Sequence, residues 1–229
     1  MTTYPPAVED YVKAIYAHTE WQPRPITTSV LAARLGLAAS SVTEMVKKLV
    51  GAGLVEHERY GAITLTADGN TEALRMLRRH RLIETWLVEQ FGYSWDEVHD
   101  EAEVLEHALS DRLLDAIDGL LGNPVRDPHG DPIPTGDGVV TRPLAVLLRD
   151  APEGHVGTVV RISDTDPQLL RQLTAESITL DRQLTVLGGR QFEVLIDGVP
   201  GERDLGDQAL ASIWISVEGD AHAVELPAL

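Results

Sequence analysis

The fold of the N-terminal third is decided by residues 27–69, which read TTSVLAARLGLAASSVTEMVKKLVGAGLVEHERYGAITLTADG. Apolar residues recur with helical spacing in two blocks, 30–35 and 42–49, and each block is followed by a glycine, Gly36 or Gly53. Glycine commonly follows the last turn of a helix because it adopts the left-handed conformation easily. The stretch therefore predicts two short helices joined by a tight turn.

The second helix carries the S-x-x-E pattern of a capping box at Ser41 and Glu44. Beyond it, residues 54–55 and 63–65 flank a Tyr-Gly pair, which predicts a two-stranded hairpin. An ordinary helical hairpin would explain the helices alone, but the attached strands favour a winged helix-turn-helix. Such a domain reads the major groove through the start of its second helix. We therefore expect DNA contacts from Ser40, Ser41, Thr43, Glu44, Lys47 and Lys48.

Charge is distributed unevenly along the 229 residues, whose formal net charge is −17. Residues 1–80 hold nine Lys and Arg against eight Asp and Glu, while residues 81–229 hold 10 against 28. The N-terminal part can therefore approach DNA, and the excess acid beyond it is either a solvated surface or a cation-binding site. A hydrophobic content of 43% excludes a disordered chain, and zero cysteines exclude disulfide scaffolds and thiolate zinc sites.

No apolar run approaches the roughly 18 residues that a membrane span needs, and the start carries no secretory signal. We therefore expect a cytoplasmic protein with no membrane partner. The chain divides into a winged helix-turn-helix domain over 1–72, a helical domain over 73–121, a Pro/Gly-rich linker over 122–142 and a small β-barrel over 143–229. The fold class is mainly α with β. The linker is predicted to act as a hinge or tether, and the apolar excess in the helical segment predicts a homodimer.

Imidazole and carboxylate side chains gather in the helical segment. His80 and Glu84 are four residues apart on one predicted helix. A second helix, starting near Trp95 or Asp96 and running through Ala108, carries His99, Glu103, Glu106 and His107, the last three on one face. A helix that buries acid and imidazole together needs a cation, whereas solvated His–Glu pairs would need none. Oxygen-rich donors without sulfur suit Mn²⁺ and other hard divalent ions.

Several stretches together carry a resemblance to a known family. They are VEDYVKAIY at 8–16, the helix-turn-helix with its wing, MLRRHRLIETWL at 76–87, EVHDEAEVLEHALSDRL at 97–113, DPHGDPIP at 127–134 and, more loosely, VGTVVRISDTDPQLL at 156–170. Through these residues the chain resembles the diphtheria toxin repressor family of metal-dependent transcriptional repressors, and most of all its manganese-responsive actinobacterial branch. The resemblance implies a helical dimerisation domain, a C-terminal SH3-like domain and no enzymatic activity.

The resemblance also implies where metals bind. The family's primary metal site falls on Asp10, Glu103, Glu106 and His107. Its ancillary site falls on His80, Glu84 and His99, and the SH3-like domain adds a carboxylate and an amide, for which the candidates are Asp164, Asp166 and Gln168. Iron-responsive members have sulfur side chains where this chain has Asp10 and Glu103. We therefore expect Mn²⁺ in two sites per protomer, with Fe²⁺, Co²⁺ or Zn²⁺ able to bind in vitro.

A metal that bridges Asp10 of the first segment and Glu103 of the second would set the angle between DNA-binding and dimerisation domains. In a homodimer, that angle spaces two recognition helices for an operator with an inverted repeat. Two alternatives remain at this point: an iron-responsive repressor of the same family, or a helix-turn-helix regulator that senses a small molecule. A metalloenzyme would leave the DNA-binding segment unexplained.

Overall fold

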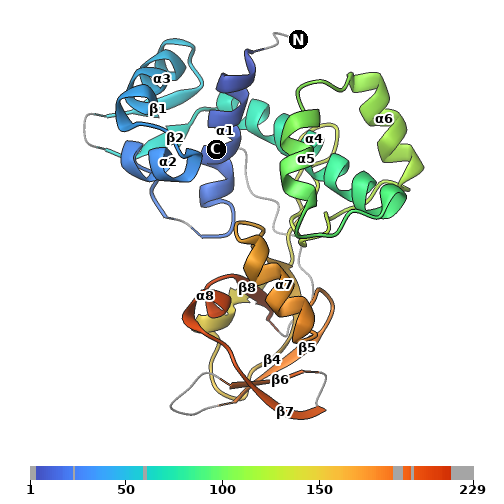
Figure 1. The fold of residues 1–229 in the computed structure, drawn as a ribbon. Coiled ribbons are helices and arrows are strands. Elements are labelled where there is room, and N and C mark those ends of the chain that lie inside the picture. Colours follow the sequence, from blue (N-terminus) through green and yellow to red (C-terminus); the bar gives the residue numbers. More distant parts are fainter. Residues whose placement is uncertain (1–3, 23, 59–60, 188–192, 197–198, 218–229) are drawn as a thin grey trace. The chain divides into compact units, whose positions relative to one another are not determined.

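The computed structural model of the chain describes residues 4–22, 24–58, 61–187, 193–196 and 199–217. Figure 1 traces these residues through their helices and strands. They group into two compact units. The first unit holds Met1–His80 and Pro134–Val139, and the second holds Arg81–Ile133 and Val140–Glu225. None of the described helices is by itself long and apolar enough to cross a membrane; only the bent pair Thr28–Leu35 and Ala39–Gly51 passes that test, when the two are taken together.

A winged helix-turn-helix makes up most of the first unit, as predicted. Three helices, α1 (Pro6–Thr19), α2 (Thr28–Leu35) and α3 (Ala39–Gly51), precede the antiparallel hairpin of β1 (Val55–His57) and β2 (Ile63–Leu65). Their buried apolar side chains form one core, which includes Ile15, Leu31, Leu49 and Leu54. Gly36 ends α2 at a φ of 64°, the left-handed conformation expected of a helix-ending glycine.

The predicted capping box at Ser41 and Glu44 is wrong. Helix α3 begins two residues before Ser41, with Ala38 at the N-cap and no side-chain hydrogen bond there. The N–H of Val42 already donates to the carbonyl of Ala38, so Ser41 lies inside the first turn. Glu44 instead forms an ion pair with Lys47: the Lys47 Nζ lies 2.7 Å from the Glu44 Oε1.

Helix α4 (Ala67–Phe91) is 25 residues long and runs through both units. Its first turn packs so closely on the wing that a Cβ at Gly69 would lie 1.9 Å from the carbonyl oxygen of Leu54, so only glycine fits. Arg75 connects α4 to α1, because its Nη2 donates to Glu9 of α1 at 2.5 Å. The same nitrogen also donates to Glu72, one turn earlier on α4, at 2.6 Å. Beyond Gly69 the helix contains neither glycine nor proline.

Two shorter helices, α5 (Val98–Leu105) and α6 (Asp111–Leu120), pack on the C-terminal half of α4. The predicted continuation of α5 through Ala108 is wrong. Glu106 is the C-cap of α5 and His107 lies in the following turn; the next helix then opens at Ser110, whose side chain accepts the N–H of Leu113. Glu103, Glu106 and His107 therefore do not share one helical face.

Residues 122–142 form a loop without helix or strand, as predicted, apart from the single bridge between Arg126 and Pro132. The loop is not the tether that its composition suggested, because Asp127, His129 and Asp131 are buried. The Asp127 carboxylate accepts the backbone N–H groups of His129 at 2.8 Å and Asp131 at 3.0 Å, which closes a tight turn. Asp131 in turn accepts the Nε–H of Arg161 at 2.7 Å.

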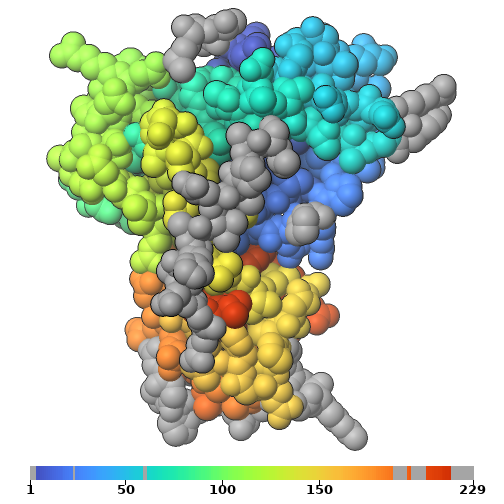
Figure 2. All heavy atoms as spheres, turned by 180° about the vertical axis from the view of Figure 1, so that it is seen from behind, coloured from blue at the N-terminus to red at the C-terminus, as the bar shows by residue number. Residues whose placement is uncertain are grey.

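The C-terminal part of the second unit is a small antiparallel β domain. It contains β3 (Ala145–Leu147), η1 (Leu148–Asp150), β4 (Val156–Ile162), α7 (Pro167–Ala175), β5 (Gln183–Leu187), β6 (Glu193–Ile196), β7 (Val199–Asp204), α8 (Asp207–Leu210) and β8 (Ile213–Ser216). The strand order is β3-β8-β4-β5-β6-β7. Strand β8 pairs with both β3 and β4. Figure 2 shows red atoms from the last described part of the chain next to yellow atoms from the beginning of this domain.

Candidate metal centre and nucleic-acid interface

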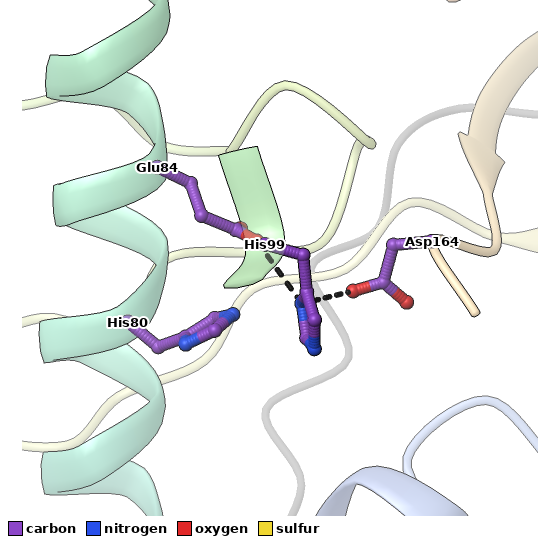
Figure 3. A group of neighbouring side chains, drawn as sticks. All are labelled: His80, Glu84, His99 and Asp164. Atoms are coloured by element: carbon purple, nitrogen blue, oxygen red, sulfur yellow. Dashed lines mark ion pairs between the residues drawn. The ribbon is translucent and has the colours of Figure 1, made fainter. Parts of the chain in front are cut away.

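Four side chains that the sequence analysis singled out form one group (Figure 3). His80 and Glu84 project from successive turns of α4, His99 comes from α5, and Asp164 follows β4. One ligand atom from each of the four lies within 4.8 Å of the others. Residues far apart in the sequence thus bring two imidazoles and two carboxylates together.

His99 is the centre of this group. Its Nδ1 lies 3.1 Å from an oxygen of Asp164 and 3.4 Å from Oε1 of Glu84. Its Nε2 lies 3.7 Å from the carboxylate of Glu103, one turn later on α5, as the four-residue spacing predicted. Glu84 is only 1% exposed, so its charge is held where water cannot screen it.

The pKa values of this group reflect its buried negative charge. Burial alone would lower the pKa of His99, but the hydrogen bonds and charges of Asp164 and Glu84 outweigh it and raise that pKa to about 11. Burial would raise the pKa of Asp164, yet the contact with His99 holds it well below its usual range. The pocket therefore favours a positive charge next to its carboxylates, and imidazole nitrogens with carboxylate oxygens are donors that fit a divalent cation.

His129 and Asp127 lie next to the group and were not among the predicted site residues. His129 is 0% exposed; its Nε2 lies 2.6 Å from the Trp95 carbonyl, and its Nδ1 lies 3.8 Å from Oε2 of Glu84. Burial would lower the pKa of His129, but Glu84 raises it to about 10. Burial, followed by the charges of Asp131 and Glu84, raises the pKa of Asp127 to about 7. Two aspartates flanking a histidine within DPHGD are the signal that could have identified them.

The residues assigned to the primary site are placed on both units. Asp10 lies half-buried on α1 in the first unit. In the second unit Glu103 is on α5, and Glu106, 0% exposed, has its Oε1 3.5 Å from Nε2 of His107. The acid and imidazole of the E-H pair are thus neighbours, although the helix has already ended.

Of the three candidates beyond β4, only Asp164 joins the group around His99. Asp166 is the N-cap of α7, where its carboxylate accepts the N–H groups of Gln168 at 2.8 Å and Leu169 at 3.2 Å. Its other oxygen accepts from Gln208 at 2.5 Å. The side chain of Gln168 is exposed on the first turn of α7.

All six residues predicted to contact DNA lie exposed on α3: Ser40, Ser41, Thr43, Glu44, Lys47 and Lys48. The structure thereby places hydroxyl and ammonium groups on one solvent-facing stretch of the recognition helix, which suits phosphate contact.

An apolar surface lies on the helical part of the second unit. Phe91 is 60% exposed, and it lines an open hollow together with Trp86, Leu87, Tyr93, Leu105, Leu109 and Leu113. Apolar side chains that line an open hollow in this way favour a protein–protein contact.

Family models match most of the chain. Residues 5–63 match the N-terminal DNA-binding domain of iron-dependent repressors, residues 66–135 match their metal-binding and dimerisation domain, and residues 146–217 match the FeoA domain. The β domain is therefore the SH3-like domain that the sequence predicted.

Individual relatives agree with these models. The diphtheria toxin repressor of Corynebacterium glutamicum is 30% identical over 189 residues, covering 82% of this chain and 77% of the relative. The iron-dependent repressor IdeR of Mycobacterium leprae is 29% identical over 210 residues, covering 86% of this chain and 90% of the relative. The solved structure of a manganese-dependent transcriptional repressor in complex with manganese is 50% identical, with a TM-score of 0.88 over 91% of this chain and 99% of that one.

These relatives are DNA-binding repressors and not enzymes, and this chain carries the DNA-binding, dimerisation and FeoA domains in that order. The chain therefore belongs to the diphtheria toxin repressor family of metal-dependent transcriptional repressors.

Proposed function

We propose that this repressor responds to Mn²⁺ and binds two ions per protomer. The observation that carries the proposal is the group of Glu84, His99 and Asp164, in which nitrogen and oxygen donors from three separate segments converge without sulfur. Mn²⁺ is the weakest binder of the divalent first-row series, so hard oxygen donors are needed to favour it. The 50% identity to a manganese-dependent repressor supports the same choice.

The primary ion is held by Asp10, Glu103, Glu106 and His107, and the ancillary ion by His80, Glu84, His99 and Asp164. The burial of Glu106 at 0% exposure supports the first assignment, because a carboxylate in that position gains from a cation. Asp166 and Gln168 stay weaker candidates for the ancillary ion, since Asp166 already caps α7.

The primary ion would couple the two units. Asp10 belongs to the DNA-binding domain, whereas Glu103, Glu106 and His107 belong to the dimerisation domain. A cation bound to both sets restricts the orientation of the recognition helices in a homodimer. Metal and DNA then favour each other's binding by equal free energies, as linkage requires.

The DNA target is an operator with an inverted repeat, because a two-fold symmetric dimer presents two copies of α3 to two half-sites. Ser40, Ser41, Thr43 and Glu44 approach the groove, and Lys47 and Lys48 neutralise phosphates. The protein works in the cytoplasm, where both the operator and free Mn²⁺ are available to it.

An Asp10→Ala variant tests the coupling. Chelator-treated protein is loaded with excess Mn²⁺, and operator binding is measured by mobility shift. The variant should keep its fold and dimer but bind the operator more weakly than wild type. Asp100→Ala, which removes an exposed carboxylate from α5, is the matched control and should bind normally. Equal operator affinity of Asp10→Ala and wild type would rule out the bridging ion.

The same assay addresses the two alternatives. A small-molecule sensor would bind its operator equally well after chelation. An iron-responsive repressor would be activated as well by Fe²⁺ as by Mn²⁺ at matched free concentrations under anaerobic conditions.

A further inference from the structure

Helix α3 carries one acidic residue, Glu44, among the side chains that approach DNA in the proposed function. The buried residues Val42, Val46 and Leu49 define the side of the helix that faces the core. With about 3.6 residues per turn, Glu44 lies almost directly opposite that side, and Ser40 lies on the same line one turn earlier. Glu44 is therefore central on the face that a recognition helix turns toward the major groove.

The carboxylate of Glu44 is held by Lys47, one turn later on the helix. The Lys47 Nζ lies 2.7 Å from the Glu44 Oε1, and the side chains are 67% and 66% exposed. The hydrogen bond and the charge of Lys47 lower the pKa of Glu44, so this side chain is ionised at neutral pH. An ionised carboxylate has two oxygens that accept hydrogen bonds and no hydrogen to donate.

A carboxylate at the centre of a DNA-binding face gains only from a hydrogen-bond donor. The phosphates repel it, because they are negatively charged and offer acceptors alone. In the major groove, guanine presents two acceptors, and thymine presents an acceptor and a methyl group. The donors there are the amino groups of cytosine and adenine. Adenine has an acceptor nitrogen beside its amino group, which would repel the second carboxylate oxygen, whereas cytosine has a C–H at that place.

The neighbouring hydroxyl of Thr43 is not available for the same task. Its Oγ1 donates to the carbonyl of Ala39 at 2.8 Å, so its hydrogen is used within the helix. Glu44 thus combines the central position on the outward face with a side chain whose chemistry distinguishes one base from the other three.

We propose that Glu44 is a specificity-determining residue for operator binding: its carboxylate accepts a hydrogen bond from the 4-amino group of a cytosine. Each half-site of the operator then contains a C·G pair at the position that Glu44 meets. The proposal rests on the use of α3 as the recognition helix in the proposed function. Lys47 remains a cation close to the phosphates, and it offsets the charge of Glu44 without selecting a base.

Three variants of the full-length protein separate base recognition from charge. Glu44→Gln keeps the length of the side chain but adds a donor, and glutamine pairs with adenine through one donor and one acceptor. Lys47→Ala removes the cation and keeps the carboxylate. Glu153→Gln removes an exposed carboxylate from the SH3-like domain and is the matched control for the lost charge.

Each protein, with excess Mn²⁺, selects duplexes from a random-sequence DNA pool, and the bound duplexes are sequenced. Wild type and Glu153→Gln should select an inverted repeat with a C·G pair in each half-site that Glu44→Gln replaces by A·T. Lys47→Ala should keep the C·G pair and bind all duplexes more weakly. Exchange of that pair should cost wild type about 5- to 150-fold in affinity by mobility shift.

A modified base tests the single contact. A duplex in which pyrimidin-2-one replaces the cytosine lacks only the 4-amino group at that position. Wild type should lose affinity for this duplex by a factor similar to that of the base exchange, whereas Glu44→Gln should be nearly unaffected. The response of Glu44→Gln controls for any change in the DNA itself.

Three results would overturn the proposal. The first is an unchanged base preference in Glu44→Gln. The second is tighter binding of Glu44→Gln to every duplex by the same factor, which would make Glu44 a repulsive charge and no more. The third is normal wild-type affinity for the pyrimidin-2-one duplex. If wild type selects no inverted repeat at all, the error lies in the proposed operator, and the base assignment falls with it.

Discussion

Replacement of Gly130 by alanine tests how tightly the Asp127–Asp131 turn holds the SH3-like domain. Gly130 has a φ of +91°, and an added Cβ would lie 2.0 Å from the carbonyl oxygen of Val160 and 2.9 Å from Cα of Arg161. The left-handed backbone costs a residue with a Cβ about 1–2 kcal/mol. Forcing the two backbones apart costs a further 1–3 kcal/mol or so.

Gly154→Ala is the matched control. Gly154 also has a positive φ, +80°, but no atom lies within 4 Å of its added Cβ. It should therefore show only the backbone cost, so the two variants should differ by about 1–3 kcal/mol. For a protein of this size, that difference lowers the melting temperature of Gly130→Ala by about 2–12 °C relative to Gly154→Ala.

Differential scanning calorimetry of the metal-free proteins measures the melting temperatures, and Mn²⁺ titration measures the consequence for the site. Gly130→Ala should also weaken the ancillary metal, because the end of β4 moves together with Asp164. Melting of the two variants at the same temperature would refute the close-packing argument. Normal ancillary binding in a clearly destabilised Gly130→Ala would refute the link between the turn and the metal.

Four further predictions concern DNA, pH and metal choice. Lys48→Ala should weaken binding to every DNA sequence and reduce the salt slope of log K by about one, whereas Arg149→Ala on the SH3-like domain should change neither. Because the pKa of His99 is raised to about 11 without metal, Mn²⁺ must displace its proton. Ancillary affinity measured by titration at pH 6.5, 7.5 and 8.5 should therefore rise about tenfold per pH unit, and a flat profile would contradict that. The contacts that raise the pKa of His99 also stabilise the metal-free fold while His99 is protonated. This contribution to stability is complete below about pH 6.5 and is lost as the pH rises toward 11. Glu103→Cys combined with Asp10→Met should shift activation of DNA binding from Mn²⁺ toward Fe²⁺ or Co²⁺ under anaerobic conditions, since thiolate favours softer ions.

The winged helix-turn-helix was predictable because its signals are local. Apolar periodicity and the glycine after each helix lie within the same 27–69 stretch that folds. The pairing of His99 with Glu103 was likewise readable, since a spacing of four residues places both on one face of α5.

Features that depend on distant partners were not predictable. Pro and Gly identify residues 122–142 as a loop, but its burial depends on Arg161, which pairs with Asp131 from thirty residues away. Helix α5 ends at Leu105 although no glycine or proline follows it before Ser110, so the sequence carries no local stop signal there. The choice between Asp164 and Asp166 required knowledge of where α7 begins, because the residue at the N-cap uses its carboxylate there.

Helix α4 has a mechanical consequence for signalling. Sharp kinks in helices occur mainly at proline, at glycine or where the hydrogen-bond ladder is interrupted, and α4 has neither residue beyond Gly69. At 1.5 Å per residue, this helix is about 37 Å long; its first half packs with the DNA-binding helices, and its second half carries Glu84. Reorientation within either unit then occurs by shear, with α1–α3 sliding on the first half of α4 or α5 on its second half. The side chains at those contacts, such as Arg75 against Glu9, determine how far it can go.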